Sequence, residues 1–123
     1  MSEYTPDAWV IVKIITETET IYKVMGGWYG GYGGSDSWRI NSGITAIINE
    51  GDHYAIKGVS GSTYFCGSQW QRMTGLMSSV YDGWVRSLAK APEQSDISLS
   101  IIDINDVPDT IFFKGAADEL GTS

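Results

Sequence analysis

The sequence predicts an α+β fold, a mostly antiparallel β-sheet meander with one principal amphipathic helix. Short β-branched and aromatic runs follow one another at close spacing over residues 9–66, with turn residues between them, which is typical of antiparallel strands. From Met73 onward, apolar residues instead recur at steps of three and four, the period of one helix face. A chain of 123 residues suits one compact domain, so we expect a single domain over residues 1–123.

The first strands follow from two apolar runs. WVIVKII at residues 9–15 is apolar at nearly every position, which predicts a strand buried on both faces. The polar TETET at 16–20 is a turn or an exposed edge before a second strand at 21–25. Residues 38–49 predict a longer strand with a kink near Gly43, because glycine in a strand often marks a bend.

Turn residues then divide the rest of the meander. EGD at 50–52 and SGS at 60–62 separate strands at 53–59 and 63–66. The helix that follows has one apolar face, made of Met73, Leu76, Met77, Val80, Tyr81, Trp84, Val85 and Leu88.

The end of the helix and the C-terminal region carry weaker patterns. Gly75 and Gly83 each cost the helix up to about 1 kcal/mol relative to alanine, so we expect a close neighbour or a frayed first turn. Pro92 ends the helix. Two late strands, at residues 98–104 and 110–114, flank an NDVPD turn, and we expect a loose tail over 115–123.

Charge limits the classes of partner. The formal net charge is −7, which argues against polymeric nucleic acid and anionic membranes as partners. Residues 22–90 carry six basic and four acidic side chains, a net of +2, whereas the two ends carry eleven acids and two lysines, a net of −9. A slightly basic middle within an acidic chain repels long polyanions and still admits a small one. Solubility alone is the alternative explanation.

The sequence also predicts a cytoplasmic location. It has no apolar run near the roughly 20 residues that span a bilayer and no signal-peptide pattern. Its only cysteine, Cys66, excludes an internal disulfide, which suits a reducing compartment.

Nothing in the sequence indicates catalysis. His53 and Cys66 fall in neighbouring predicted strands, but no acid is placed to orient the imidazole, and a buried, inert cysteine is the simpler interpretation. The DINDVPD cluster lacks the spacing of a calcium loop, so we interpret it as an acidic turn. We therefore expect no enzyme activity, no metal and no cofactor.

The stretch GGWYGGYGGSDSWRINSG, residues 26–43, alternates glycines with aromatic rings and then supplies an arginine. Glycines allow close backbone approach, rings such as Trp28 and Tyr29 offer stacking faces, and a guanidinium matches phosphate. A ligand pocket is therefore expected here, and the alternative is a hairpin whose rings belong to the core or to a dimer interface. The residues that would form the pocket are Trp38, Arg39, Tyr64, Trp70, Arg72, Met73 and Thr74.

GGWYGGYGGSDSWRINSGI, followed by YAIKGVSGSTYFC and MTGLMSSVYDGWV, resembles the first anti-Thoeris family of phage proteins over roughly residues 22–90. These proteins are sponges: in the host cytoplasm they sequester, intact, the cyclic ADP-ribose signals of bacterial TIR-domain enzymes. The resemblance implies a homo-oligomer built from dimers, with ligand pockets where sheet and helix residues of adjacent protomers meet. It also implies a separate site for cyclic oligonucleotides in some members.

The resemblance further implies roles for individual residues. Arg39 would contact phosphate, Asn41 a polar edge of the ligand, and Tyr64 would stack on adenine. Met73 and Thr74 would line the pocket from the start of the helix. The last role implied is a ligand contact by a basic residue late in the helix, either Arg86 or Lys90. The acidic region from Asp96 onward has no counterpart in the family.

Three other functions stay open on the sequence. A carbohydrate-binding module would use Trp28, Tyr32 and Trp38 as a platform for sugar rings. A virion assembly protein would use the glycine-aromatic stretch between subunits. A hydrolase of cyclic nucleotides is the enzymatic alternative.

Overall fold

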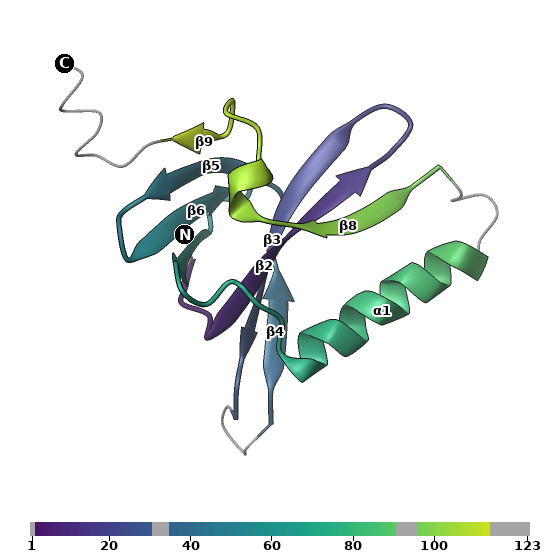
Figure 1. Ribbon diagram of the computed structural model, residues 1–123, viewed down its shortest axis with the longest axis horizontal. Coiled ribbons are helices and arrows are strands. Elements are labelled where there is room, and N and C mark those ends of the chain that lie inside the picture. The colour runs from purple at the N-terminus through teal and green to yellow at the C-terminus, as the bar shows by residue number, and fades with distance from the viewer. Residues whose placement is uncertain (1, 31–34, 91–95, 114–123) are drawn as a thin grey trace.

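The computed structural model describes residues 2–30, 35–90 and 96–113. Within them the chain forms two β-sheets and one long helix, as Figure 1 shows. The predicted α+β class is confirmed, because most strand pairs are antiparallel. The expected loose tail at 115–123 lies outside the described residues. No helix among those described has the length and apolar character needed to cross a bilayer.

The four-stranded sheet is antiparallel throughout and has the order β4-β3-β2-β8. Its strands are β2 (Ala8–Ile15), β3 (Thr20–Trp28), β4 (Ser37–Ile40) and β8 (Ser98–Ile102). The second strand is longer than the sequence pattern predicted, because it continues through the two glycines at 26–27 to pair with β4.

The five-stranded sheet has the order β1-β7-β6-β5-β9. Strands β5 (Ile44–Asn49), β6 (His53–Gly58) and β7 (Thr63–Gly67) form the antiparallel meander that the turn residues predicted. The two edge strands, β1 (Glu3–Tyr4) and β9 (Phe112–Phe113), are two residues long and pair in parallel with their neighbours.

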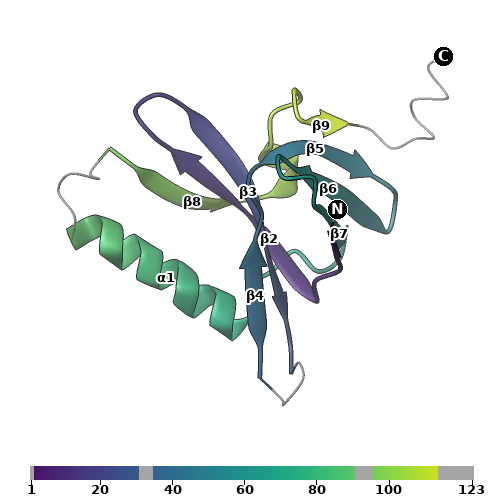
Figure 2. The same cartoon turned by 180° about the vertical axis from the view of Figure 1, so that it is seen from behind.

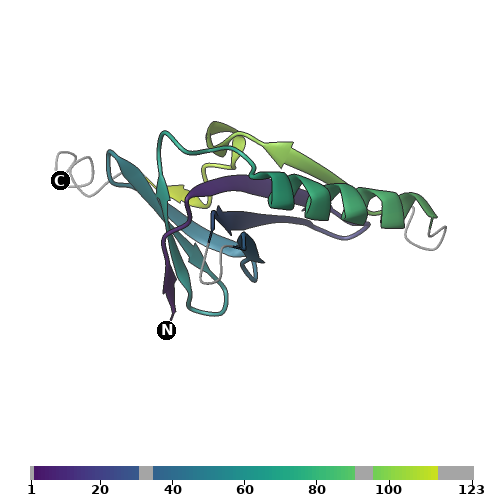
Figure 3. The ribbon, with the colours of Figure 1, turned by 90° about the horizontal axis from the view of Figure 1, so that it is seen from below.

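Strand β2 is buried on both faces over residues 8–12, as its almost continuous apolar run predicted. Trp9 and Ile11 face a core between the two sheets, whereas Val10 and Val12 face a second core beneath the helix. Alternation of side chains along a strand explains how one segment serves both cores. Figures 2 and 3 show the consequence, with β2 and β3 between the helix on one side and the five-stranded sheet on the other.

Helix α1 (Gly75–Lys90) begins at a capping threonine. The Thr74 Oγ1 accepts a hydrogen bond from the Met77 amide at 3.1 Å, which satisfies an amide that has no partner within the helix. Met77 is the helix's fully buried residue and rests on Gly27 of β3: a Cβ at Gly27 would lie 2.5 Å from the Met77 Sδ. The glycine therefore sets how closely the helix approaches the sheet.

The two helix glycines have no such role. A Cβ at Gly75 or at Gly83 would meet no atom of the described residues within 4 Å, so the close neighbour considered for them is absent there.

The predicted strand at 38–49 is wrong as one unit, because it is two strands in different sheets. Residues 41–43 carry the chain from β4 across to β5, and Gly43 has a φ of +139°, a conformation that favours glycine. Asn41 fixes the crossing: its backbone N–H donates to the Val24 carbonyl at 3.0 Å, and its side-chain Oδ1 accepts from the Val24 backbone N–H at 2.9 Å.

The predicted strand at 98–104 is also too long. After β8 the chain enters a short 3-10 helix, η3 (Ile104–Asp106), which Asp103 caps by accepting from the Asn105 amide at 2.8 Å. Gln71 then links η3 to the segment before the helix, donating to Asp103 and accepting from the Ile104 amide. Of the strand expected at 110–114, only the two residues of β9 are in strand conformation among those described.

Candidate functional site

His53 and Cys66 do not form a catalytic pair. His53 is the cross-strand partner of Gly67, so its ring lies on the opposite face of the sheet from the Cys66 side chain. Cys66 is fully buried, and burial raises the pKa of its thiol, which keeps it protonated and inert. The expectation that no acid is placed to orient the imidazole is wrong, because the ring contacts Asp52 at 2.7 Å and Glu50 at 3.0 Å through the turn between β5 and β6. Within the described ranges, no three His, Cys, Asp or Glu residues are grouped as a metal site.

This arrangement predicts a small pH dependence of stability. The hydrogen bond to Asp52 is the main reason that the pKa of His53 is raised above 6.5. The stabilisation is therefore complete below the unfolded-state pKa and is lost as the pH rises through the raised value. Because the ring is partly exposed, we expect a loss below about 1 kcal/mol. Urea unfolding at about pH 6 and pH 8.5 would measure it, and His53→Gln should remove the difference; an equal pH dependence in the variant would contradict this assignment.

The surface cleft that gathers rings and a cation lies beside the N-terminal segment. We call it the Trp70 cleft; it encloses about 620 Å³ and is lined by Thr5, Pro6, Asp7, Tyr29, Gly67, Trp70 and Arg72. Three segments build it: the link between β1 and β2, the residue after β3, and the loop from the end of β7 toward α1.

Two half-exposed rings and one guanidinium give the cleft its chemistry. Tyr29 is 48% exposed and Trp70 is 47% exposed. The guanidinium carbon of Arg72 lies 4.5 Å from the centre of the Trp70 ring, within the range of a cation–π contact. Stacking in this way holds a flexible side chain in place and leaves its N–H groups free to bind an anion.

Arg72 has no carboxylate partner among the described residues. The ion pairs found in this part of the chain are those of His53 with Asp52 and Glu50. The acid in the described lining, Asp7, accepts a hydrogen bond from the Tyr29 amide at 2.9 Å. The guanidinium thus lies at the cleft with its charge unneutralised by the described residues.

The Trp70 side of the cleft is tied to the central strand. The Trp9 amide donates to the Trp70 carbonyl at 3.1 Å, and the Trp9 indole Nε1 donates to the Gly67 carbonyl at 2.7 Å. The Trp70 amide also donates to the Gly67 carbonyl at 3.0 Å. A Cβ at Gly67 would lie 2.7 Å from the Trp70 ring, so glycine there lets the ring lie flat on the turn. The backbone that carries the ring is therefore positioned before any ligand arrives.

The opposite side of the cleft is held in a similar way. The Asp7 amide donates to the Gly27 carbonyl at 2.9 Å, while the Asp7 carboxylate accepts from the Tyr29 amide. The Trp28 indole donates to the Thr5 carbonyl at 2.9 Å. These bonds fix the backbone that carries the Tyr29 ring.

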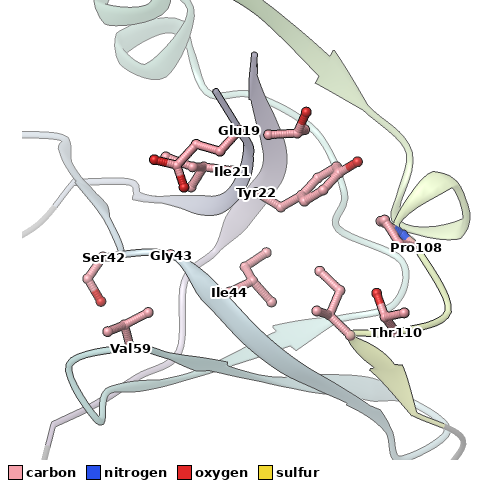
Figure 4. A pocket seen from close by; sticks show the side chains of 11 residues that line it. Glu19, Ile21, Tyr22, Ser42, Gly43, Ile44, Val59, Pro108 and Thr110 are labelled. Atoms are coloured by element: carbon pink, nitrogen blue, oxygen red, sulfur yellow. The ribbon is translucent and has the colours of Figure 1, made fainter. Parts of the chain in front are cut away.

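A second hollow, shown in Figure 4, has the wrong chemistry for an anion. It encloses about 590 Å³ between the start of β3, residues 42–44 and the turn before β9. Its polar groups are hydroxyls, such as Ser42, Tyr22 and Thr110, and the Glu19 carboxylate. Among the described residues, no lysine or arginine is in its lining. We therefore take the Trp70 cleft as the candidate site.

The structure brings only part of the predicted pocket together. Trp70 and Arg72 share the cleft, and Tyr29, which the sequence suggested only as a stacking face, joins them. Asp7 and Gly67 were missed. Nothing in their local sequence signals a site, because their roles depend on contacts with distant segments.

Trp38 and Arg39 are not together in a pocket. They are neighbours on β4, so their side chains point to opposite faces of the sheet. Trp38 packs edge-on against Trp84 of α1, with ring centres 5.5 Å apart. The Arg39 guanidinium carbon lies 4.6 Å from the centre of the Tyr4 ring, on the other face.

Three predicted contact residues are buried and perform structural work instead. Tyr64 is 1% exposed, its ring centre lies 5.0 Å from that of Tyr4, and burial raises its pKa to about 12, so it has no free face for an adenine. Asn41 is 5% exposed and holds the Val24 backbone, and Thr74 is 1% exposed and caps α1. The prediction that these three residues contact a ligand is therefore wrong.

The other predicted contacts lie away from the cleft. Met73 is partly buried against the core beneath the helix, and Arg86 is exposed on α1. Neither lines the Trp70 cleft.

The sugar platform suggested by the sequence is likewise divided. Trp28 packs against Tyr4 on one face of the sheet, and Trp38 lies on the helix face. Tyr32 is outside the described residues.

In comparisons with protein-family models, with curated proteins and with solved structures, no match to this chain is found.

Proposed function

We propose that this protein binds a small cyclic nucleotide in the Trp70 cleft and holds it intact. The observation that carries the proposal is the Arg72 guanidinium, stacked on Trp70, without an ion pair among the described residues, and sharing the cleft with Tyr29. A nucleotide offers what such a site can bind, a flat base and a phosphate.

The magnitudes favour this ligand class. Stacking on an aromatic ring contributes about 1–3 kcal/mol per base, and a guanidinium binds phosphate through charge-assisted hydrogen bonds. The cleft of about 620 Å³ falls within the range of about 300–1,000 Å³ typical of small-molecule sites. The net charge of −7 disfavours long polyanions, so we propose a small ligand and no polymeric nucleic acid or membrane partner.

The lining favours sequestration over hydrolysis. Among the described residues, no histidine, cysteine or lysine lines the cleft, and its one carboxylate, Asp7, has no partner there that would complete a catalytic pair. The hydrogen bonds that hold the backbone on both sides of the cleft lower the ordering cost of binding, which favours tight binding and slow release.

The resemblance to the first anti-Thoeris family supplies the biological form of the proposal. The protein is then a phage sponge acting in the host cytoplasm, its ligands are cyclic ADP-ribose isomers or cyclic oligonucleotides, and it works as a homo-oligomer built from dimers. Exposed apolar side chains such as Trp38 and Val85 support an interface between copies.

The test is a binding panel followed by recovery of the ligand. We expect one or more cyclic ADP-ribose isomers or cyclic oligonucleotides to raise the melting temperature of the protein. Boiling the complex should then return the same molecule, as chromatography and mass spectrometry would show. The absence of any shift across the panel would end the proposal, and recovery of a cleaved product would replace sequestration with hydrolysis.

A carbohydrate ligand is the second candidate, supported by Asp7 beside the two exposed rings. A carboxylate that accepts from sugar hydroxyls, next to aromatic faces, suits a neutral sugar. This alternative predicts binding that does not depend on phosphate or on the charge of residue 72.

Gly67→Ala should weaken ligand binding while leaving the fold intact. The added methyl group would lie 2.7 Å from the Trp70 ring, and the half-exposed ring can move away from it. We expect at least a fivefold loss of affinity by calorimetry, with a melting temperature within a few degrees of the wild-type value. Gly75→Ala is the matched control, because a Cβ at Gly75 would meet no described atom within 4 Å. Gly51 also has open space around it, but its positive φ would strain an alanine. Unchanged affinity in the Gly67 variant would show that the position of the Trp70 ring does not matter.

A further inference from the structure

A separate groove lies between α1 and the four-stranded sheet. It encloses about 370 Å³, and we call it the helix groove; its lining is Val12, Ile14, Lys23, Ile40, Trp84, Ser87, Leu88, Ile97 and Leu99. It shares no residue with the Trp70 cleft.

Strand register explains why the groove is apolar. Ile14 on β2 is the cross-strand partner of Leu99 on β8, so the two side chains lie side by side on the helix face. Trp84 and Leu88 are four residues apart on α1, one above the other on the face that meets the sheet.

Lys23 is the one charged residue that the described part of the chain contributes to this lining. It is the cross-strand partner of Val12, which is buried on the helix face, so its stem lies among apolar side chains. The side chain is partly buried, and it has no hydrogen bond or ion pair within residues 2–30, 35–90 and 96–113. The ammonium group at the end of that stem is a positive charge beside an apolar groove, and an anion that enters the groove could pair with it.

We propose that the helix groove binds a small amphipathic carboxylate, an aliphatic acid of medium chain length. The chain would lie along Ile14, Leu88 and Leu99, and the carboxylate would pair with Lys23. A volume of about 370 Å³ is near the lower end of the range for small-molecule sites, which limits the length of the chain. The groove has no arginine and is almost wholly apolar, so it does not suit a nucleotide. The proposal does not depend on the function of the Trp70 cleft.

The experiment is isothermal titration with hexanoate, octanoate and decanoate, each below its micelle concentration. Each added methylene should tighten binding about fourfold until the groove is full, since a buried methylene contributes about 0.8 kcal/mol. Decanol should bind at least tenfold more weakly than decanoate, because it lacks the charge. Lys23→Met should remove this preference while keeping an apolar stem, and Lys57→Met, at an exposed position on the other sheet, should leave it unchanged.

A second variant distinguishes a ligand groove from an interface. Ser87→Trp places a large ring at the rim from an exposed position and should block decanoate without loss of folding. No heat with any acid, or equal affinity for decanoate and decanol, overturns the proposal. Dissociation of an oligomer in the Ser87 variant, together with no acid binding to the wild-type protein, overturns it as well, because a second copy would then occupy the groove.

Discussion

Arg72→Glu is expected to lower the affinity for the proposed nucleotide by at least about 100-fold. The variant removes a charge-assisted bond to phosphate, about 1.5–3 kcal/mol, and adds repulsion between two anions at the same point. A factor of 100 corresponds to about 2.8 kcal/mol, so the two effects together are sufficient. The fold should be unaffected, because Arg72 is exposed and its contact is with the surface of Trp70.

Titration calorimetry of the variant beside two matched controls makes this test specific. Arg86→Glu makes the same change of charge on the exposed surface of α1, away from the cleft, and should change affinity by less than about threefold. Arg39→Glu tests the residue that the sequence favoured and the structure places over Tyr4. If Arg39→Glu abolishes binding and Arg72→Glu does not, the ligand binds outside the Trp70 cleft. If neither variant changes the affinity, the carbohydrate alternative is favoured.

Gly27→Ala is expected to destabilise the protein by about 1–3 kcal/mol, the usual range for overpacking a core. The new methyl group would lie 2.5 Å from the Met77 Sδ and 3.1 Å from the Thr74 Cγ2. Met77 is fully buried and Thr74 caps α1, so neither side chain can move without disturbing the start of the helix. Relief of this clash requires α1 to shift away from β3.

A second glycine provides the matched control with the opposite sign. A Cβ at Gly83 would meet nothing within 4 Å, so Gly83→Ala should stabilise the helix by up to about 1 kcal/mol. Urea denaturation of both variants measures the two changes. A Gly27 variant as stable as the wild type would show that close contact between α1 and β3 is not needed.

The parts of the fold that the sequence predicts are those set by periodicity. The almost continuous apolar run of β2 matches its two buried faces, and the three- and four-residue steps after Met73 match α1. The parts it does not predict depend on distant segments. Asn41 ends β4 because its side chain binds the backbone of Val24, and β1 and β9 are short strands held by the neighbours that they pair with.

Less of the candidate site than of the fold could be predicted from the sequence, because residue type alone does not determine whether a side chain is buried. In the sequence, Trp70 and Tyr64 suit a stacking surface equally well. In the structure Trp70 is exposed, whereas Tyr64 is buried against Tyr4 and has no free face. Thr74 suited a ligand contact equally well, but its hydroxyl is needed at the start of α1. Tyr29 enters the cleft because Asp7, 22 residues earlier, holds its amide.

The two bonds from Trp9 to residues 67 and 70 have a consequence for motion. Trp9 lies in the middle of the protein, where solvent exchange of its protons requires an opening that approaches global unfolding. Residues 67–70, which are bonded to Trp9, therefore cannot open as a lid. Binding and release of a ligand therefore depend on the rotamers of Tyr29, Trp70 and Arg72. The motion of these surface side chains, and not of the backbone, then sets the lifetime of the complex.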